Sequence, residues 1–437
     1  MVVPIGRIAR EQPFQAIPAG DRRIGAYLRL NRIQLGGGIL IAVLLPVLLR
    51  QGPQIFLPEV LSFGSAEYAL VGTFCALIAG YVLLREFSGF PTVRTASYVI
   101  PSFLAAYGIV ALIFFFWRID YSRFQFAVSF LAAVIWFYSL HSMYRKDREP
   151  RLALVPGGED NGVTDIRGAR WQRLSEPDAN IFAFDGIVAD LRADFSPDWQ
   201  RFIAKCVLSA RPVYHVKQIT ESLTGQVAIE HLSENSFGSV LPSSFYLKIK
   251  RLADFAAAIA LLPFVLPVIA ITAVLIKLES GGPVFFCQSR MGYQGKPFTI
   301  YKLRSMRQDI DDDRRFTLEQ DPRVTKIGRL IRKYRIDELP QIINILKGEM
   351  SWIGPRPEAV ELAEWYERDI PFYAYRHAVR PGISGWAQIN QGNVAEIDAA
   401  TAKLHYDFYY IKHFSPSLDL LIVIKTIKTI LTGFGSR

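Results

Sequence analysis

Residues 252–276 read LADFAAAIALLPFVLPVIAITAVLI, an apolar run with two prolines near its centre. The run exceeds the ~20 apolar residues that a helix needs to cross a bilayer. Pro263 and Pro267 each remove a helix hydrogen bond and favour a kink. Basic residues flank both ends, which the positive-inside rule therefore places in the cytoplasm. We expect a bent, re-entrant helix; the alternative, a fifth straight span, would place the last 160 or so residues outside the cell.

Four further apolar segments occupy the first third of the chain, at residues 35–49, 68–84, 98–117 and 124–140. Each approaches the length of a membrane span. Arginines lie before the first segment, in the second loop and after the fourth, whereas residues 51–67 of the first loop contain no Lys or Arg. This distribution predicts four transmembrane helices with a cytoplasmic N-terminus and a cytoplasmic remainder after Tyr144. Arg118 and Arg123 in the short third loop are the discordant residues. The basic residues that carry the prediction include Arg22, Arg23, Arg29, Arg32, Arg85, Arg94, Arg145, Lys146, Arg148 and Arg151.

Composition supports residence in a membrane. The 437-residue chain is 51% hydrophobic, and 50 Lys and Arg outnumber 40 Asp and Glu to give a net charge of +10. Such an excess indicates contact with anionic lipids or phosphorylated substrates, with nucleic acid a less favoured partner. Cys75, Cys206 and Cys287 are too dispersed to predict a disulfide framework or a zinc site.

The patterns predict a four-part membrane protein. Residues 1–33 form a cytoplasmic tail, 34–144 a four-helix transmembrane bundle, 145–246 a small α/β (Rossmann-like) domain, and 247–437 the re-entrant helix with an α/β catalytic domain. In the small domain we expect strands at 152–158, 181–184 and 212–216 and a helix at 197–208. Its Gly157-Gly158 pair is not a dinucleotide fingerprint, so a regulatory or oligomerising role is favoured.

The last domain shows a hairpin and several helices. Strands are expected at 283–288 and 298–302 around a turn at 292–295. Helical periodicity covers 327–339 and 339–346, with a break expected at Pro340. Residues 418–431 predict an apolar helix that carries Lys425 and Lys428 and lies in the membrane interface.

Asp337 and Glu338 are adjacent carboxylates in a basic part of this domain. Taken alone, such a pair is usually a solvated helix face. One carboxylate could nevertheless act as a nucleophile while the other holds a metal, as transfer of a phosphate-bearing group requires. Arginines, whose forked guanidinium matches phosphate oxygens, recur in the surrounding motifs. They are Arg290, Arg332, Arg335, Arg356 and Arg380.

Seven ordered motifs over some 180 residues, from Lys250 to about Leu431, resemble the bacterial sugar transferases, which are monotopic polyprenyl-phosphate glycosyl-1-phosphate transferases. The preceding spans and soluble domain resemble the larger members, which initiate exopolysaccharide, capsule or O-antigen synthesis. The motifs are Lys250-Arg251 with Asp254, Gln288-x-Arg-x-Gly292, Tyr301-Lys302-x-Arg-Ser-Met306, Asp337-Glu338-Leu-Pro-Gln341, Gly354-Pro-Arg-Pro357, Arg380-Pro-Gly382 with Gly385-Trp-Ala-Gln388, and Tyr409-Tyr410 with Asp419-Leu420.

The resemblance implies a reaction. Asp337 would attack the sugar-linked phosphate of a UDP-sugar to form an aspartyl-phosphosugar and release UMP, and Glu338 would hold Mg²⁺ against the diphosphate. Undecaprenyl phosphate would then accept the phosphosugar on the cytoplasmic face of the bacterial inner membrane. Substrate phosphates would contact residues of the matching motifs, and three residues would position the chain near the membrane. The first group is Arg290, Lys302, Arg304, Arg332, Arg356, Arg380 and Gln388, and the second is Lys250, Arg251 and Asp254.

Several alternatives stay open. Many relatives carry Ser before the helix-breaking proline, where this chain has Leu266, so its bend depends on Pro263, Pro267 and packing. The acidic run 309–313 favours an exposed loop over a metal site. A degenerate membrane scaffold and a hydrolase that passes the phosphosugar to water are the rival functions. A homodimer is suggested only by analogy with the larger relatives, and the sugar is not identified by any motif.

Overall fold

The computed structural model describes residues 31–51, 64–90, 95–143, 149–158, 162–209, 211–228, 244–307, 321, 323–391 and 397–432. The chain divides into two compact units, Met1–Gly225 and Gln226–Arg437. Some residues used in the sequence predictions lie outside the described residues. They are Arg22, Arg23, Arg29, Arg94, Arg145, Lys146, Arg148 and the acidic run 309–313.

The first unit begins with apolar helices, as the sequence predicted. They are α2 (Asn31–Gly38), the π-helical η1 (Ile39–Leu44), α3 (Leu45–Gln51), α4 (Ser65–Ser88), α5 (Thr95–Phe116) and α6 (Arg123–Met143). Leu77, Phe103 and Phe137 belong to the core that they share. Gly80 permits close packing, because a Cβ there would lie 2.5 Å from the Phe103 ring.

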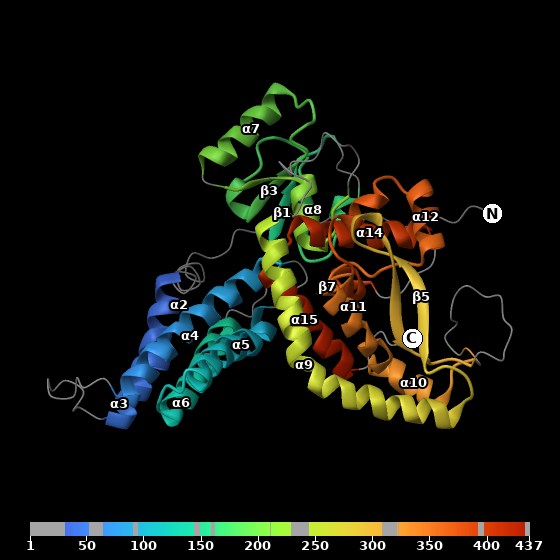
Figure 1. Cartoon of the computed structure of the whole chain (residues 1–437). Helices are drawn as coiled ribbons and strands as arrows, with labels where there is room; N and C mark the ends of the chain where they lie inside the picture. The colour runs from blue at the N-terminus through green and yellow to red at the C-terminus, as the bar shows by residue number, and fades with distance from the viewer. Residues whose placement is uncertain are drawn as a thin grey trace. The chain divides into compact units, whose positions relative to one another are not determined.

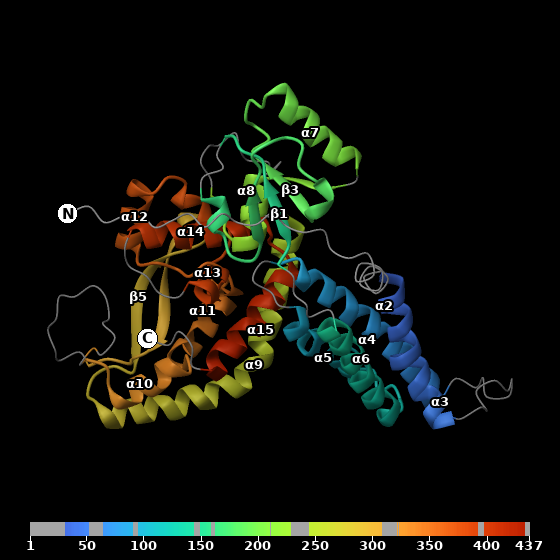
Figure 2. The same ribbon diagram turned by 180° about the vertical axis from the view of Figure 1, so that it is seen from behind.

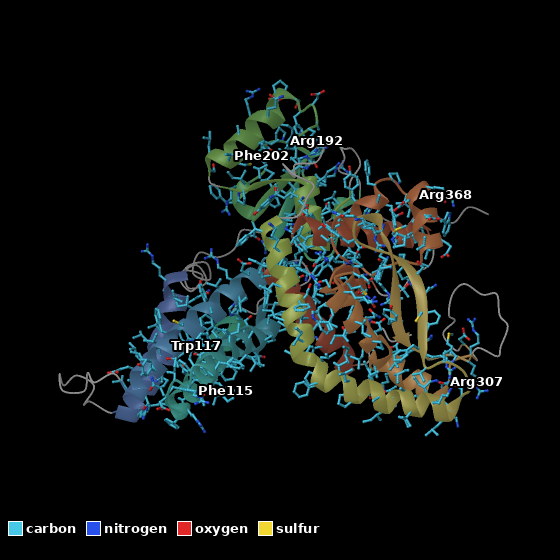
Figure 3. The ribbon with its side chains drawn as sticks, in the orientation of Figure 1. Phe115, Trp117, Arg192, Phe202, Arg307 and Arg368 are labelled. Atoms are coloured by element: carbon cyan, nitrogen blue, oxygen red, sulfur yellow. The ribbon has the colours of Figure 1, made fainter. Side chains whose placement is uncertain are left out.

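Aromatic residues mark the end of α5. Phe115 and Trp117 project outward with 74% and 73% of their surface exposed (Figure 3). Exposed aromatic side chains at a helix end are typical of the interface between lipid and water. Across the described residues, five helices are long and apolar enough to cross a membrane: the α2–α3 segment, α4, α5, α6 and α9.

The first unit also contains a four-stranded parallel sheet. Its strands are β1 (Arg151–Leu154), β2 (Arg170–Arg173), β3 (Gly186–Ala189) and β4 (Val213–His215), in the order β2-β1-β3-β4. The helices α7 (Pro197–Leu208) and α8 (Val216–Thr224) complete the expected α/β unit. The strand predicted at 181–184 is wrong. The Asn180 side chain accepts a hydrogen bond from the Phe182 amide and caps a 3₁₀ turn, η5 (Ile181–Ala183), so that the strand begins only at Gly186.

The second unit begins with α9 (Ser244–Glu279), which contains both Pro263 and Pro267. The helix bends visibly along its length, as two opposite views show (Figures 1 and 2). Only 11% of its most apolar window is buried within the protein, compared with 28% to 44% for the four long apolar segments of the first unit. The protein itself therefore leaves most apolar side chains of α9 uncovered, which indicates contact with another apolar environment.

A hairpin and a short parallel pair form the strands of the second unit. The expected hairpin is confirmed as β5 (Phe285–Met291) and β6 (Pro297–Leu303), joined through the turn η7 (Tyr293–Gly295). β7 (Ser351–Ile353) pairs in parallel with β8 (Gly382–Ser384). The helices are α10 (Lys326–Lys333), η8 (Ile336–Gln341), α11 (Ile342–Lys347), α12 (Val360–Asp369), η9 (Tyr373–Ala378), α13 (Trp386–Asn390), α14 (Ile397–Lys412) and α15 (Pro416–Thr432).

The predicted helix break at Pro340 is wrong. The α-helix α10 ends at Lys333, and Arg335 adopts a left-handed backbone with φ 54°. Pro340 lies inside the 3₁₀ helix η8, which continues directly into α11. In the 3₁₀ pattern the missing N–H of Pro340 removes only the bond to the carbonyl three residues earlier, and the helix continues.

Candidate active site

Asp337 and Glu338 lie on the first turn of η8, whose N-cap residue is the left-handed Arg335. A non-glycine residue in this conformation costs about 1–2 kcal/mol and is often found at functional sites. The reversal separates the pair from α10, and η8 then packs against β6. The two carboxylates therefore occupy a fixed turn rather than an exposed helix face.

Glu338 is buried, with 5% of its surface exposed, among cations from three separate segments. Its Oε1 accepts hydrogen bonds from Arg356 Nη1 at 2.9 Å and from Lys302 Nζ at 3.2 Å. Its Oε2 lies 3.7 Å from Arg335 Nη1 and has no hydrogen-bond partner among the described residues. Burial by itself raises the pKa of Glu338, but these three cations outweigh it and hold the pKa well below its ordinary value.

Asp337 has a contrasting environment. No hydrogen bond to its carboxylate occurs in the described part of the chain. Burial and then the charge of Glu338 raise the pKa of Asp337 to about 6, although Lys302, Arg332 and Arg356 oppose this rise. Neighbouring carboxylates with opposite pKa shifts are typical of paired residues with different chemical roles.

Arg356, Lys302 and Arg332 are the predicted site residues that the structure brings to the pair. The Arg332 Nε donates to Ser305 Oγ at 2.8 Å, and its charge acts on Asp337. Arg290 lies one step further out. Its Nη1 donates to the Pro357 carbonyl at 3.2 Å and its Nη2 to Gln288 Oε1 at 2.6 Å. Arg290 thus contacts the loop that carries Arg356.

Three predicted phosphate ligands have other contacts. Arg304 donates from Nη1 to the carbonyl of Gly281 and from Nη2 to that of Ser280, at the end of α9. The Arg380 Nε donates to the Gly348 carbonyl at 2.9 Å. The Gln388 Nε2 donates to the Ile383 carbonyl at 3.3 Å, and its Oε1 has no partner among the described residues. Their phosphate-binding roles stay predictions.

The residues predicted to position the chain at the membrane attach α9 to the α/β part of the second unit. The Lys250 Nζ lies 2.7 Å from Asp419 Oδ2 on α15. Arg251 donates to the carbonyls of Ile345 and Leu346 at the end of α11. Ser351 on β7 donates to Asp254 Oδ2 at 2.6 Å.

The carboxylate pair fits a divalent cation carried by a phosphorylated substrate. No group of three or more His, Cys, Asp or Glu residues able to hold a metal occurs within the described ranges. Magnesium, however, commonly binds one or two carboxylates together with substrate phosphates and water. The buried Glu338 Oε2, which accepts no hydrogen bond from a described residue, offers such a ligand.

The sequence reasoning missed a second layer of buried charge behind Arg356. Arg376, 3% exposed, donates from Nη2 to the Arg356 carbonyl at 3.0 Å and to Asp407 Oδ2 at 2.8 Å. Lys403 pairs with Glu358 in the same layer. Arg376 and Asp407 belong to none of the recognised motifs, and the lack of solvent that makes them noteworthy is a property of the fold.

Comparison with known proteins agrees with this geometry. Residues 245–433 match the model of the family described as bacterial sugar transferase. The chain is 45% identical over 409 residues, 92% of its length and 94% of the relative's, to the UDP-N-acetylgalactosamine-undecaprenyl-phosphate N-acetylgalactosaminephosphotransferase of Aeromonas hydrophila. Two enzymes named UDP-glucose:undecaprenyl-phosphate glucose-1-phosphate transferase match a smaller part of the chain. The Escherichia coli (strain K12) protein is 42% identical over 183 residues, 41% of this chain and 39% of its own. The Caulobacter vibrioides protein is 41% identical over 187 residues, 42% of this chain and 70% of its own.

The chain belongs to the bacterial sugar transferase family. The resemblance found in the motifs is thereby confirmed, and so is the prediction of a membrane enzyme that carries a large N-terminal region.

Proposed function

We propose that this enzyme transfers a sugar-1-phosphate from a UDP-sugar to undecaprenyl phosphate, releasing UMP, as the first membrane step of a polysaccharide pathway. The observation that carries the proposal is the contrast between Asp337 and Glu338 within a surplus of cations. Lys302, Arg332 and Arg356 act on both the pair and any anion brought to it. Such a site suits attack by one anion on another.

The reaction proceeds in two displacements. An Asp337 carboxylate oxygen forms a bond to the sugar-bearing phosphorus, and the bond from that phosphorus to the bridging oxygen breaks, with the electron pair leaving on UMP. An oxygen of undecaprenyl phosphate then attacks the same phosphorus and returns Asp337 as a carboxylate. Covalent catalysis of this kind gives ping-pong kinetics.

Each residue of the pair has a distinct role. Asp337 is the proposed nucleophile because its pKa is raised while that of Glu338 is lowered, which makes the Asp337 carboxylate the more basic of the two. Glu338, kept ionised by Arg356 and Lys302, is the proposed Mg²⁺ ligand. When bound, Mg²⁺ would supply Lewis-acid stabilisation of diphosphate charge. Arg356 and Arg332 would orient the phosphates.

The bent α9 supports a re-entrant insertion into the cytoplasmic leaflet of the bacterial inner membrane. Both ends of α9 attach to the same unit, through Lys250–Asp419 near its start and Arg304–Ser280 just past its end. A straight crossing would require this unit to lie on both sides of the bilayer. A bend at Pro263 and Pro267 instead keeps both ends, and the active site, on one face.

Lipid contact follows from the same arrangement. The exposed apolar residues of α9, together with Ile427 on α15, would enter the acyl region, and basic residues at both ends of α9 would meet anionic headgroups. Four spans in the first unit complete the proposed topology. Homodimerisation stays a prediction from analogy.

Release of UMP from a panel of UDP-sugars tests the function. Purified enzyme with Mg²⁺ and undecaprenyl phosphate should release UMP from one sugar nucleotide. UDP-N-acetylgalactosamine is the first to try, because the relative that spans nearly the whole chain is named for it. Without acceptor we expect one UMP per enzyme and a phosphosugar on the Asp337 peptide. Turnover without undecaprenyl phosphate would indicate a hydrolase, and no UMP from any UDP-sugar would indicate a scaffold.

Labelling from each side of the membrane tests the topology. Single cysteines at Lys248 and Lys296, in a background without the native cysteines, should both react from the cytoplasmic side of inner-membrane vesicles. A periplasmic Lys296 would overturn the re-entrant arrangement and leave the assignment of Asp337 unaffected.

A further inference from the structure

The loop that carries Arg356 is held by its carbonyl groups. Pro355 and Pro357 have no N–H to donate, so the loop depends on donors that reach it from elsewhere. Four consecutive carbonyls accept hydrogen bonds from three other segments, β5, η9 and β8. They are Pro355 from Gly382 N at 2.9 Å, Arg356 from Arg376 Nη2 at 3.0 Å, Pro357 from Arg290 Nη1 at 3.2 Å, and Glu358 from Met291 N at 2.9 Å.

Arg376 is the donor at the central position, and its guanidinium is fixed on all sides. Its Nε and Nη2 donate to Asp407 Oδ2 at 3.1 and 2.8 Å, and its Nη1 donates to the Tyr373 hydroxyl at 2.7 Å. Asp407 is 1% exposed and lies on α14, whereas Tyr373 lies on η9 beside Arg376. The planar guanidinium of Arg376 therefore links α14 to the Arg356 backbone through hydrogen bonds of fixed geometry.

A buried ion pair alone would not need the fourth contact. Replacing such a pair by apolar residues is often neutral for stability, so stability alone is a weak reason for its presence. The contact with the Arg356 carbonyl provides a second reason. It holds the backbone of the residue whose side chain donates to Glu338 Oε1 at 2.9 Å. Shifts of about 1 Å in a catalytic group can cost a large factor in rate.

We propose that Arg376 is a positioning residue, which holds the Arg356 backbone so that the Arg356 guanidinium meets Glu338 and the substrate diphosphate. Asp407 and Tyr373 orient Arg376 for this task. The inference rests on the proposed function for the role of Arg356, but the contact between the two arginines does not depend on which sugar is transferred.

Steady-state UMP release by matched variants provides the first test. Arg376→Lys keeps the charge and loses the fork, and we expect kcat/KM to fall about 10- to 100-fold with a higher KM for the UDP-sugar. Tyr373→Phe removes one hydroxyl acceptor and should cost about 2- to 5-fold. Tyr366→Phe is the control, since this buried ring lies 5.4 Å from that of Tyr373 and makes no hydrogen bond to Arg376 among those described. It should stay within about 2-fold of wild type.

A double-mutant cycle separates positioning from a purely structural role. If Arg376 acts through Arg356, Arg356→Lys combined with Arg376→Lys should be within about 3-fold of the worse single variant. A merely structural role would lower the folded fraction and apparent kcat with KM unchanged, and the two losses would multiply. Either of those results would overturn the proposal. Tyr373→Phe against Tyr366→Phe keeps the test decisive if Arg376→Lys does not fold.

Chemical labelling gives a readout that needs no substrate. We expect phenylglyoxal to modify Arg356 at least about 3-fold faster in Tyr373→Phe or Arg376→Lys than in wild type, because a released loop frees its guanidinium. Unchanged labelling in folded variants would refute the inference. If wild type releases no UMP from any UDP-sugar, the proposed function fails, and the labelling still decides whether Arg376 holds Arg356.

Discussion

The second unit contains two sets of buried carboxylates whose surroundings differ sharply. Asp419 accepts hydrogen bonds from Tyr246, Lys250 and Tyr410, and Asp254 accepts one from Ser351. Three hydroxyl groups and one ammonium thus bind this first set, which joins α9, β7, α14 and α15. In the second set, Asp337 and Glu338 are surrounded by cations and retain unfilled acceptor positions. A carboxylate held mainly by fixed hydroxyl donors supports structure, whereas one held mainly by cations, with an unfilled acceptor position, can take part in chemistry.

The balance of charge shows the same contrast. Lys250 is the only cation that directly pairs with Asp254 and Asp419 among the described residues. Lys302, Arg335 and Arg356 pair with Glu338, and Arg332 adds its charge at Asp337. The second set therefore has cations available for an anionic diphosphate, and the first set does not.

The largest effect expected from breaking this contrast is on catalysis. Asp337→Asn should lower UMP release at least about 1,000-fold, because the amide cannot form the acyl phosphate. The same chemical change at Asp419 should leave the turnover of correctly folded enzyme within about 3-fold of wild type. Initial rates per folded molecule measure both, and full activity of Asp337→Asn would refute the nucleophile assignment.

The next largest effect is on stability and concerns the first set of carboxylates. Asp419→Asn leaves two tyrosine hydroxyls and the Lys250 ammonium without their shared carboxylate, so the free energy of unfolding should fall by about 3 kcal/mol. Denaturation in detergent micelles measures this loss. A variant as stable as wild type would mean that the carboxylates of the first set do not hold α9 to the unit.

A smaller effect concerns pH. The pKa of Asp337 rises from 3.8 to about 6, so its ionisation costs folding energy above pH 6 and none below its unfolded value. Wild type without metal should therefore gain on the order of 2 kcal/mol on acidification from pH 7.5 to 5, relative to Asp337→Asn. Thermal unfolding at the two pH values measures this difference. UMP release should decline over the same range, because the nucleophile must be ionised; an acid-insensitive rate would contradict the assignment.

The smallest effect sharpens the structural side of the comparison. Ser351→Ala removes the donor at 2.6 Å from Asp254 Oδ2 and should lower the free energy of unfolding by about 1 kcal/mol. UMP release should not change. A loss of activity greater than the loss of stability would show that the first set also influences catalysis.

Local pattern predicted much of the fold. Hydropathy predicted the apolar helices α4, α5, α6 and α9. Two short strand-like segments around the 292–295 turn predicted the β5–β6 hairpin. Two local errors have local causes. Asn180 caps a 3₁₀ turn where the apolar residues 181–184 predicted a strand. The helix is interrupted at Arg335 and not at Pro340, because the 3₁₀ helix η8 accommodates the proline.

The sequence by itself determined the family and the apolar segments, and it pointed to Asp337 and Glu338 as the candidate reactive pair, because these depend on residue types in a fixed order along the chain. Only the tertiary structure decided which arginine meets which oxygen. Arg356 reaches Glu338, Arg304 reaches carbonyls at the end of α9, and Arg376, outside every motif, supports Arg356. The sequence alone does not distinguish one arginine from another. Burial and distance, which arise only when remote segments pack together, give each guanidinium group its role.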